Sequence, residues 1–473
     1  MKRATIVDRR AARACLAAAS LVLSGCASFS PDGGFGPVQQ AAKERLGKEL
    51  AWARSDPARE ALQQRVAELL AKPLSADDAV QVALLNNRGL QAAFFELGIS
   101  DADRVQAGRL ANPGFSFGRL RRGAEVELER GLHLNLARLL AMPMVNPMER
   151  RRFEQTQRQT VAQVLDVASE TRKAYFMAVG ADETVRYMRQ VQDAAEAGAE
   201  LGRRMAAVGN WNKLNQAREQ SFYADAALNL ARAVQAQTSA REKLTQLLGA
   251  WGEQTAFTLP ERLPDLPQNP QDLPDVEQVA MQQRLDVQAA RWGAEQTAKN
   301  LGLTRTTRFV NVLELGLVNS RSNEAPTQRG YEIGFELPLF DWGGARVAKA
   351  EAIYMQAVER AAQTAIEARS EVREAYLGYR NRYDIARHYR DEIVPLKKRI
   401  SDENLLRYNG MLIGVFELLA DARSQIASVN GAIEALRDFW VAQADLDMAL
   451  IGKPRMAAAT GPALAAEAGG PAH

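Results

Sequence analysis

Cysteine and histidine are nearly absent from this chain, which has 2 cysteines and 3 histidines among its 473 residues. The histidines, His133, His388 and His473, are too dispersed in the sequence to form a zinc site. Cys15 lies in a leader that we expect to be removed, so Cys26 would be the only cysteine of the mature chain and no disulfide could form within it. A nucleophile elbow, a P-loop and a paired-cysteine motif are also lacking. The sequence therefore indicates neither an enzyme nor a cofactor, and it predicts no metal site.

Long apolar runs and an excess of one charge are lacking as well. After the leader, no segment approaches the roughly twenty consecutive apolar residues that a membrane helix requires. Any membrane crossing would therefore have to be made by strands. The 60 Lys and Arg residues nearly balance the 57 Asp and Glu residues, which gives no indication of nucleic acid binding.

The N-terminus has the features of an export signal. A basic start is followed by a short apolar core from Ala14 to Leu23 and then by Ser24-Gly25-Cys26, which predicts a signal peptide over residues 1–25. These small residues resemble a bacterial lipobox, in which the cysteine is acylated and becomes the first residue of the mature protein. We therefore predict lipidation at Cys26 and a lipidated segment over residues 26–72; an ordinary cleaved signal with an incidental cysteine is the alternative. Ala27 replaces the Asp of inner-membrane retention signals, which favours the outer membrane.

The rest of the chain is built from two similar halves. Residues 82–93 read VALLNNRGLQAA and residues 279–290 read VAMQQRLDVQAA, and each block leads into strand-like segments. This predicts a first repeat over residues 73–259 and a second over residues 275–452. Five prolines between them mark residues 260–274 as an extended linker rather than a buried element. The tail, residues 453–473, is rich in Ala, Gly and Pro and is expected to be disordered.

Each repeat contains a pair of alternating segments. Apolar and polar residues alternate from Glu125 to Leu136 and again from Tyr331 to Leu339, which predicts strands with one apolar and one polar face. Residues 115–120 and 309–318 are their expected partners. Strands of about ten residues can cross a bilayer when tilted, but only a closed barrel pairs every backbone group. Four strands cannot close a barrel, so several chains would have to pool theirs; the alternative is a pair of hairpins in a soluble sheet.

The segments after the strands predict long helices. Residues 148–207 and 345–407 contain few helix breakers, and about sixty helical residues extend roughly 90 Å. Residues 217–248 and 417–450 would run back along them, with turns near residues 208–211 and 409–414. Each half would therefore form a long helical hairpin. Pro395 is expected to bend its helix because it removes a backbone hydrogen bond.

The motifs of this duplicated chain resemble those of the TolC-type outer membrane factors. The strongest match is residues 334–352, GFELPLFDWGGARVAKAEA, at the predicted junction of strand and long helix. Similar blocks are Pro73-Leu74-Ser75 with residues 83–87, Gly209-Asn210 with residues 217–220, residues 241–244 with Leu248-Gly249, and residues 416–423. The resemblance covers nearly all of the mature chain, from Pro73 to Gly452.

The resemblance implies a mainly α-helical protein with a small β part. Three chains would each give four strands to one twelve-stranded barrel and their helices to one periplasmic tunnel. The homotrimer would be the outer membrane channel of a tripartite efflux system, a passive exit duct fed by an inner-membrane transporter and a periplasmic adaptor. The polar strand faces would line the barrel lumen with the carboxylates of Glu125, Glu127, Glu129, Glu332 and Glu336.

The resemblance also implies two kinds of site at the helical hairpin turns. Glu417 and Asp421 match the acidic residues of a periplasmic gate, and their spacing of four places them on one helical face. Alternatively, both carboxylates are solvated or paired with Arg407 or Arg423. The turns themselves would contact the adaptor, unless they are only tight turns; the residues are Gly209, Asn210, Leu214, Gly410, Gly414 and Leu418.

Three other functions fit parts of the sequence. Met142, Met144 and Met148 lie close to His133 in the predicted order, and thioethers suit Cu(I), so a heavy-metal (Cu/Ag) efflux duct is conceivable, as is a type I secretion duct. The simpler interpretation is an adaptable corner between strand and helix. From another class, a lipid-anchored periplasmic coiled-coil scaffold would carry the strands as a soluble cap and would need no detergent once its lipid was removed.

Overall fold

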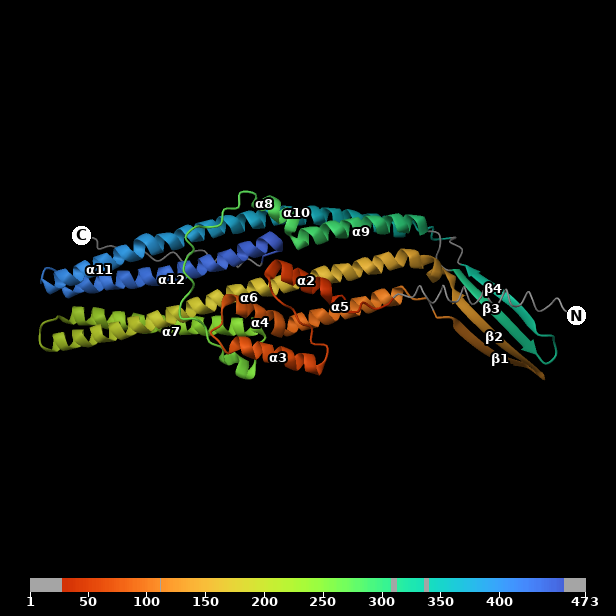
Figure 1. Cartoon of the computed structure of the whole chain (residues 1–473), viewed down its shortest axis with the longest axis horizontal. Helices are drawn as coiled ribbons and strands as arrows, with labels where there is room; N and C mark the ends of the chain where they lie inside the picture. Colours follow the sequence, from red (N-terminus) through yellow and green to blue (C-terminus); the bar gives the residue numbers. More distant parts are fainter. Residues whose placement is uncertain (1–27, 111, 308–312, 336–339, 455–473) are drawn as a thin grey trace. The chain divides into compact units, whose positions relative to one another are not determined.

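The computed structural model describes residues 28–110, 112–307, 313–335 and 340–454. The predicted signal peptide, Cys26, Glu336 and the tail from residue 455 lie outside these described residues. The described part is mainly helical, with one four-stranded sheet (Figure 1). No helix within the described ranges is long and apolar enough to cross a membrane.

The element order occurs twice along the chain. After α2 (Phe35–Leu46) and α3 (Asp56–Leu70), each half runs as two helices, two strands, a long helix and a returning helix. In the first half these are α4 (Ala76–Asn86), α5 (Arg88–Ala107), β1 (Gly114–Arg122), β2 (Glu125–Asn135), α6 (Leu136–Ala207) and α7 (Lys213–Leu248). A short 3₁₀ turn, η1 (Gly252–Ala256), follows. In the second half they are α8 (Val276–Gln283), α9 (Leu285–Thr307), β3 (Leu313–Ser322), β4 (Gln328–Phe335), α10 (Gly344–His388) continued by α11 (Val394–Asn409), and α12 (Val415–Ile451).

Local sequence explains where several of these helices begin. Ser75 caps α4 by accepting a hydrogen bond from the Asp78 amide at 3.1 Å, and Asp77 and Asp78 add negative charge at the positive end of the helix dipole. Asn212 caps α7 in the same way through the Asn215 amide at 2.8 Å. Pro395 lies in the first turn of α11, directly after a π-helical turn, η2 (Tyr389–Ile393). The α-helical hydrogen-bond pattern is thus interrupted next to this proline.

The chain divides into two compact units, and each draws on both halves. The first contains residues 1–47, 89–162 and 287–365; the second contains residues 48–88, 163–286 and 366–473. In the first unit, the ring centroids of Phe35 in α2 and Phe94 in α5 lie 5.0 Å apart. The buried Asp101 of α5 accepts a hydrogen bond from the Ser30 amide at 2.9 Å, which fixes the segment before α2.

The sheet of the first unit is antiparallel throughout, in the order β1-β2-β3-β4 (Figure 1). The predicted pairing within each half is present, and β2 and β3 join the two halves. Leu136, which the alternation assigned to a strand, instead begins α6. The strand prediction was wrong there because the strong helix formers of residues 137–141 begin the helix as soon as the pairing with β3 ends at Asn135.

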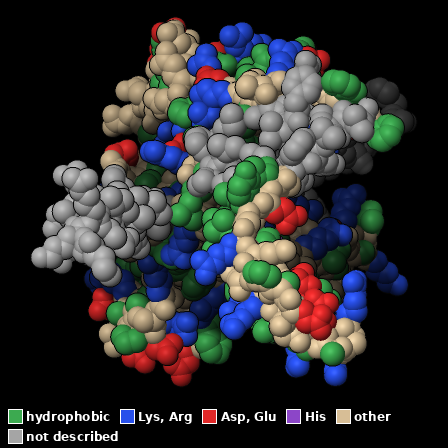
Figure 2. Space-filling view, turned by 90° about the vertical axis from the view of Figure 1, so that its right-hand side faces the viewer, with side chains coloured by type: hydrophobic (Ala, Val, Ile, Leu, Met, Phe, Trp, Pro, Cys, Tyr) green, Lys and Arg blue, Asp and Glu red, His purple; other side chains and the backbone are tan. Residues whose placement is uncertain are grey.

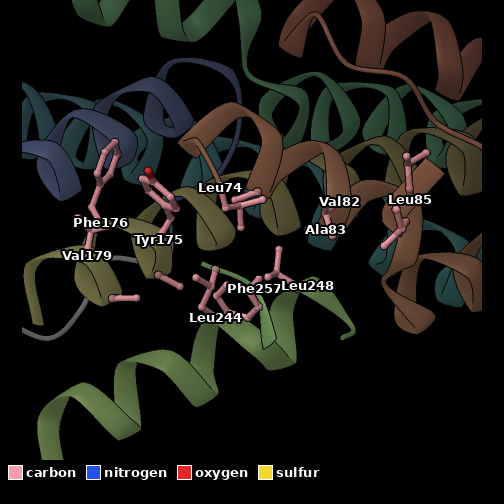
Figure 3. Packing of buried hydrophobic residues seen from close by; sticks show 14 of the residues in the cluster. Leu74, Val82, Ala83, Leu85, Tyr175, Phe176, Val179, Leu244, Leu248 and Phe257 are labelled. Atoms are coloured by element: carbon pink, nitrogen blue, oxygen red, sulfur yellow. The ribbon is translucent and has the colours of Figure 1, made fainter. Parts of the chain in front are cut away.

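The described residues of the second unit include two large apolar clusters and a smaller one, made by Val191, Ala195 and Ala226. The first brings together side chains of α4, α6 and α7, with Leu74 and Phe257 from the connecting segments (Figure 3). Burial raises the pKa of Tyr175 in this cluster to about 12, so its hydroxyl stays neutral at physiological pH. The second cluster joins α8, α10 and α12 through Val276, Val372 and Phe439.

The proline-rich linker has neither helix nor strand, as its composition predicts, but parts of it are buried. Leu263 and Leu266 are only 5% and 7% exposed, and they pack in the first and second clusters respectively. The expectation that the linker is not a buried element is therefore wrong at these positions. Side chains of α10 satisfy its backbone: the hydroxyl of Tyr383 donates to the Gln268 carbonyl at 2.6 Å, and the hydroxyl of Tyr379 accepts from the Gln271 amide at 2.9 Å.

Tyr383→Phe should therefore destabilise the second unit. The variant keeps the ring in its cluster but leaves the Gln268 and Pro267 carbonyls without this donor, at an expected cost of about 1 kcal/mol. Thermal unfolding followed by circular dichroism measures the change. Tyr354→Phe, elsewhere on α10, is the matched control and should melt with the wild type; equal losses in the two variants would contradict this account.

Candidate functional site

The turn between α6 and α7 is closed by hydrogen bonds to a single carbonyl. The amides of Asn210 and Trp211 both donate to the Met205 carbonyl, at 2.9 Å and 3.2 Å. Gly209 has φ 82°, which favours glycine at this position. Leu214, in the first turn of α7, is 58% exposed. The predicted tip residues of the first hairpin therefore form one ordered turn with an exposed apolar side chain beside it.

The turn between α11 and α12 is more apolar. The amides of Gly410 and Leu412 donate to the Leu406 and Arg407 carbonyls at 3.0 Å and 2.9 Å. Met411 has φ 58°, a conformation that few residues other than glycine adopt. The side chains of Met411 and Leu412 are 93% and 77% exposed. Both residues lie in the turn predicted near residues 409–414, at the tip expected to contact the adaptor, and an exposed apolar run is typical of a docking turn.

Gly414 and Leu418 belong to the start of α12. Gly414 is the N-cap residue, with no side chain to bind the free amides, and its carbonyl accepts from the Leu418 amide at 3.4 Å. The hairpin α11–α12 thus begins its return helix within a few residues of the exposed Met411 and Leu412.

The two candidate gate carboxylates lie one helical turn apart on α12 but have different surroundings. Glu417 is exposed, whereas Asp421 is half-buried and accepts a hydrogen bond from the side-chain amide of Asn404 in α11. Neither is seen paired with the two candidate arginines. Arg407 instead binds Glu403 at 3.1 Å, and Arg423 binds Glu219.

The ion pair of Glu219 and Arg423 was missed by sequence reasoning. Glu219 of α7 is 1% exposed, and one of its carboxylate oxygens accepts from the Arg423 guanidinium of α12 at 3.1 Å. The guanidinium also lies over the ring of Phe222, 4.3 Å from the centroid. The other carboxylate oxygen of Glu219 and Nε of Arg423 are buried without a hydrogen-bond partner. This pair joins the return helix of the first hairpin to that of the second, two residues beyond Asp421.

The predicted lumen carboxylates share one face of the sheet. The register places Glu125, Glu127, Glu129 and Glu332 on the same face as His133. Ser322 donates to Glu125 at 2.9 Å, and Ser320 donates to Glu127. The remaining predicted member, Glu336, lies outside the described residues.

His133 occupies the same polar face near its helical end. Its Nε2 lies 2.9 Å from the Ser116 hydroxyl, and its ring covers Gly316, the directly paired residue of β3. Met142 and Met148 are half-buried in the first turns of α6, and Met142 lines a groove with Asp103 and Arg152. The segment expected to be a corner is thus helical. Within the described ranges, no group of three His, Cys, Asp or Glu side chains could hold a metal ion.

Comparison with known proteins shows a similarity to one family. Residues 276–437 match the profile of the family described as Outer membrane efflux protein, and this segment includes α8 to α11, β3, β4 and most of α12. The matched segment makes up about a third of the chain and is similar to this family. Its resemblance to the outer membrane factors is therefore confirmed.

A similar protein is the cobalt-zinc-cadmium resistance protein CzcC of Cupriavidus metallidurans. The two are 26% identical over 278 residues, which are 57% of this chain and 64% of CzcC. The alignment thus spans slightly less than two thirds of the relative.

Solved structures share the fold of this chain at low sequence identity. CusC matches with a TM-score of 0.65 at 18% identity, covering 80% of this chain and 92% of that one. A membrane protein from Pseudomonas aeruginosa gives 0.68 at 20% identity, with 79% and 92% covered. The Campylobacter jejuni CmeC outer membrane channel gives 0.66 at 18% identity, with 80% and 85% covered.

Proposed function

We propose that this protein is the outer membrane channel of a tripartite efflux system, a passive exit duct. The observation that carries the proposal is the sheet, whose two faces differ and whose two edges, β1 and β4, find no further strand within the described residues. Strand edges are not tolerated in lipid. Three chains that each contribute four strands would close a twelve-stranded barrel and remove every edge.

The apolar face of the sheet supports contact with lipid. Phe115, Phe117, Leu317 and Tyr331 lie on it, and each is more than half exposed in the single chain. Figure 2, which faces the strand end, shows hydrophobic side chains open to the viewer beside basic and acidic ones. Apolar side chains at alternate positions of tilted strands are what a barrel presents to acyl chains, while the carboxylate face would line a water-filled lumen.

The helical hairpins would form the periplasmic tunnel, with their turns at its mouth. In the trimer, three copies of Glu417 and Asp421 would form the gate ring, which could hold cations and be loosened by its own repulsion. Met411, Leu412 and Leu214 offer exposed apolar contacts for a periplasmic adaptor, which would connect the duct to an inner-membrane transporter. Acylation of Cys26 would anchor the chain in the outer membrane.

Heavy-metal efflux is a second candidate within the same class. It is favoured by the identity with a protein named for cobalt, zinc and cadmium resistance and by the row of carboxylates on one face of the sheet. Carboxylates lower the electrostatic energy of a divalent cation in a narrow lumen.

A Cys26→Ser variant, exported with a non-lipoprotein signal, tests the duct against the scaffold alternative. We expect it to fractionate with outer membranes, to run as a trimer in mild detergent and to conduct ions in a planar bilayer, because the strands rather than the lipid would hold it in the membrane. A protein that is extracted without detergent and does not conduct would contradict the channel proposal and support the scaffold alternative.

The lumen carboxylates should set the ion selectivity of this channel. Replacing Glu125, Glu127 and Glu129 by glutamine removes their negative charge, so the permeability of K⁺ relative to Cl⁻ should fall several-fold. Reversal potentials in a KCl gradient measure this ratio. Glu324→Gln, in the exposed loop between β3 and β4, is the control, to be compared with each single Glu→Gln change on β2, and should change the ratio little. Unchanged selectivity in the triple variant would place these side chains outside the lumen.

A further inference from the structure

The apolar face of the sheet also carries arginines, and they gather toward the hairpin turns. In the register, Arg119 of β1 and Arg321 of β3 lie on either side of Leu128 of β2. Two strand spacings separate their Cα atoms by about 10 Å, so their long side chains can converge over Leu128.

A second pair repeats this arrangement in the next row, farther from the β1–β2 turn. Arg130 of β2 and Arg329 of β4 lie on either side of Asn319 of β3. A fifth arginine of this face, Arg121 of β1, lies opposite Val126, but its Nε donates to the Gly123 carbonyl of the turn at 3.1 Å. We call the other four, Arg119, Arg130, Arg321 and Arg329, the arginine belt. All four are exposed, and no ion pair to a carboxylate is seen for any of them within the described part of the chain.

The charges of the sheet are segregated by face. Since successive residues of a strand point to opposite sides, the carboxylates of β2 and β4 lie on the face opposite the belt. On the belt face, the described strand residues include no Asp or Glu. The guanidinium groups therefore lack an anion from their own sheet.

An apolar row lies directly beside the belt, on the side toward the helices. Phe115, Leu132, Leu317 and Tyr331 are cross-strand neighbours in the four strands, and each is at least 39% exposed. The face thus changes from apolar to cationic along the strands. A ligand that matches both parts has apolar chains attached to anionic groups.

We propose that the arginine belt binds the phosphate groups of lipid A, the glycolipid of the outer leaflet, while the apolar row contacts its acyl chains. This inference rests on the proposed function, because the turns face the outer leaflet only if the helices lie in the periplasm. Guanidinium groups bind phosphate through paired hydrogen bonds, and two of them flanking one site neutralise a doubly charged phosphate. Paired arginines in two successive rows fit a lipid that carries more than one phosphate.

Two other uses of the belt are possible outcomes of the test. In the first, the arginines extend into water at the membrane surface and bind no lipid, so no lipid would be preferred. They could also bind any anionic phospholipid, in which case phosphatidylglycerol would compete as well as lipid A.

The experiment compares lipid binding by purified trimers in mild detergent, using native mass spectrometry with lipid A, dephosphorylated lipid A and phosphatidylglycerol as probes. Wild-type trimer should bind lipid A roughly tenfold or more tightly than either of the other lipids. Replacing the four belt residues by glutamine should abolish this preference. Arg122→Gln compared with Arg119→Gln is a matched pair, because both positions are exposed on β1 but lie on opposite faces.

The outcomes separate this inference from the channel itself. A conducting wild-type trimer that loses its lipid A preference in Arg119→Gln but not in Arg122→Gln supports the belt. The lipid A proposal is contradicted if the wild-type trimer conducts but binds the three lipids equally, or if its preference persists after all four belt arginines are replaced. The channel function would stand in either case. A wild type that neither trimerises nor conducts overturns the proposed function, and the belt with it.

Discussion

Arg284→Met should lower the free energy of unfolding of the second unit by about 3 kcal/mol or more. Arg284 lies between α8 and α9 and is fully buried. Its guanidinium binds Asp286 at 2.7 Å and Glu371 at 2.6 Å. Burial alone would lower the pKa of Arg284, but the hydrogen bonds to these carboxylates hold it above the usual value, so the cation persists. Methionine fills much of the space but leaves both carboxylates without their buried partner.

The matched control is Arg373→Met. Arg373 of α10 binds Glu277 of α8 at 2.9 Å, but both side chains are largely exposed, so water replaces the lost partner and the cost should stay under about 1 kcal/mol. Urea unfolding of the two variants measures the difference. Similar losses would mean that the burial of Arg284 adds nothing to its pair. Lys453 remains 3.8 Å from Glu371 and limits the effect at that carboxylate, so the larger share should come from Asp286.

Arg284 has a second role, and its position is marked by the alignment of the two halves of the chain. In the aligned blocks Arg284 stands where the first half has Asn87. The Asn87 side chain donates to the Leu247 carbonyl at the end of α7 at 3.0 Å, and Arg284 donates to the Ala449 carbonyl at the end of α12 at 3.4 Å. Both residues thus supply donors to the free carbonyls of a returning helix. The duplication thus marks position 284 as a donor site, but it does not predict that Asp286 and Glu371 pair with Arg284.

Local patterns predicted most elements, and the failures have a common cause. Alternation located β2 and much of β4, and the scarcity of breakers located the hairpins, because both depend on residues close in sequence. The burial of Leu263 and Leu266 was not predictable in this way. Their environment is made by several helices at once, and the tyrosines of α10 that bind the linker backbone lie more than a hundred positions away.

The candidate gate shows the same limit. The carboxylates Glu417 and Asp421 are marked by a motif, and the structure places them one turn apart on α12. The partner of Arg423, however, lies 204 positions earlier, at Glu219. No local signal distinguishes this glutamate from the solvated glutamates of other polar helices. Residues that would hold the proposed gate in place are therefore harder to predict than the carboxylates that would form it.

Glu219→Ala should increase the open population of the channel roughly tenfold or more. The carboxylate is a buried, charge-assisted acceptor for Arg423, and a hydrogen bond of this kind contributes about 1.5–3 kcal/mol. Its loss frees the start of α12, which carries the gate carboxylates, from α7. Single-channel recordings of open probability in planar bilayers measure the shift, which follows from the proposed gate.

A charge swap separates the ion pair from simple loss of packing. In Glu219→Arg combined with Arg423→Glu, the pair can form again between α7 and α12, so the open probability should return toward the wild-type value, whereas either single change should raise it. Glu403→Ala, which removes the exposed partner of Arg407 near the same turn, is the control and should have little effect because water compensates. If the double variant has the same open probability as the single variants, the ion pair does not hold the start of α12 against α7. The acidic ring would then have to be kept closed by Asn404 and Asp421 within each α11–α12 hairpin, and Asn404→Ala would become the variant that opens the channel.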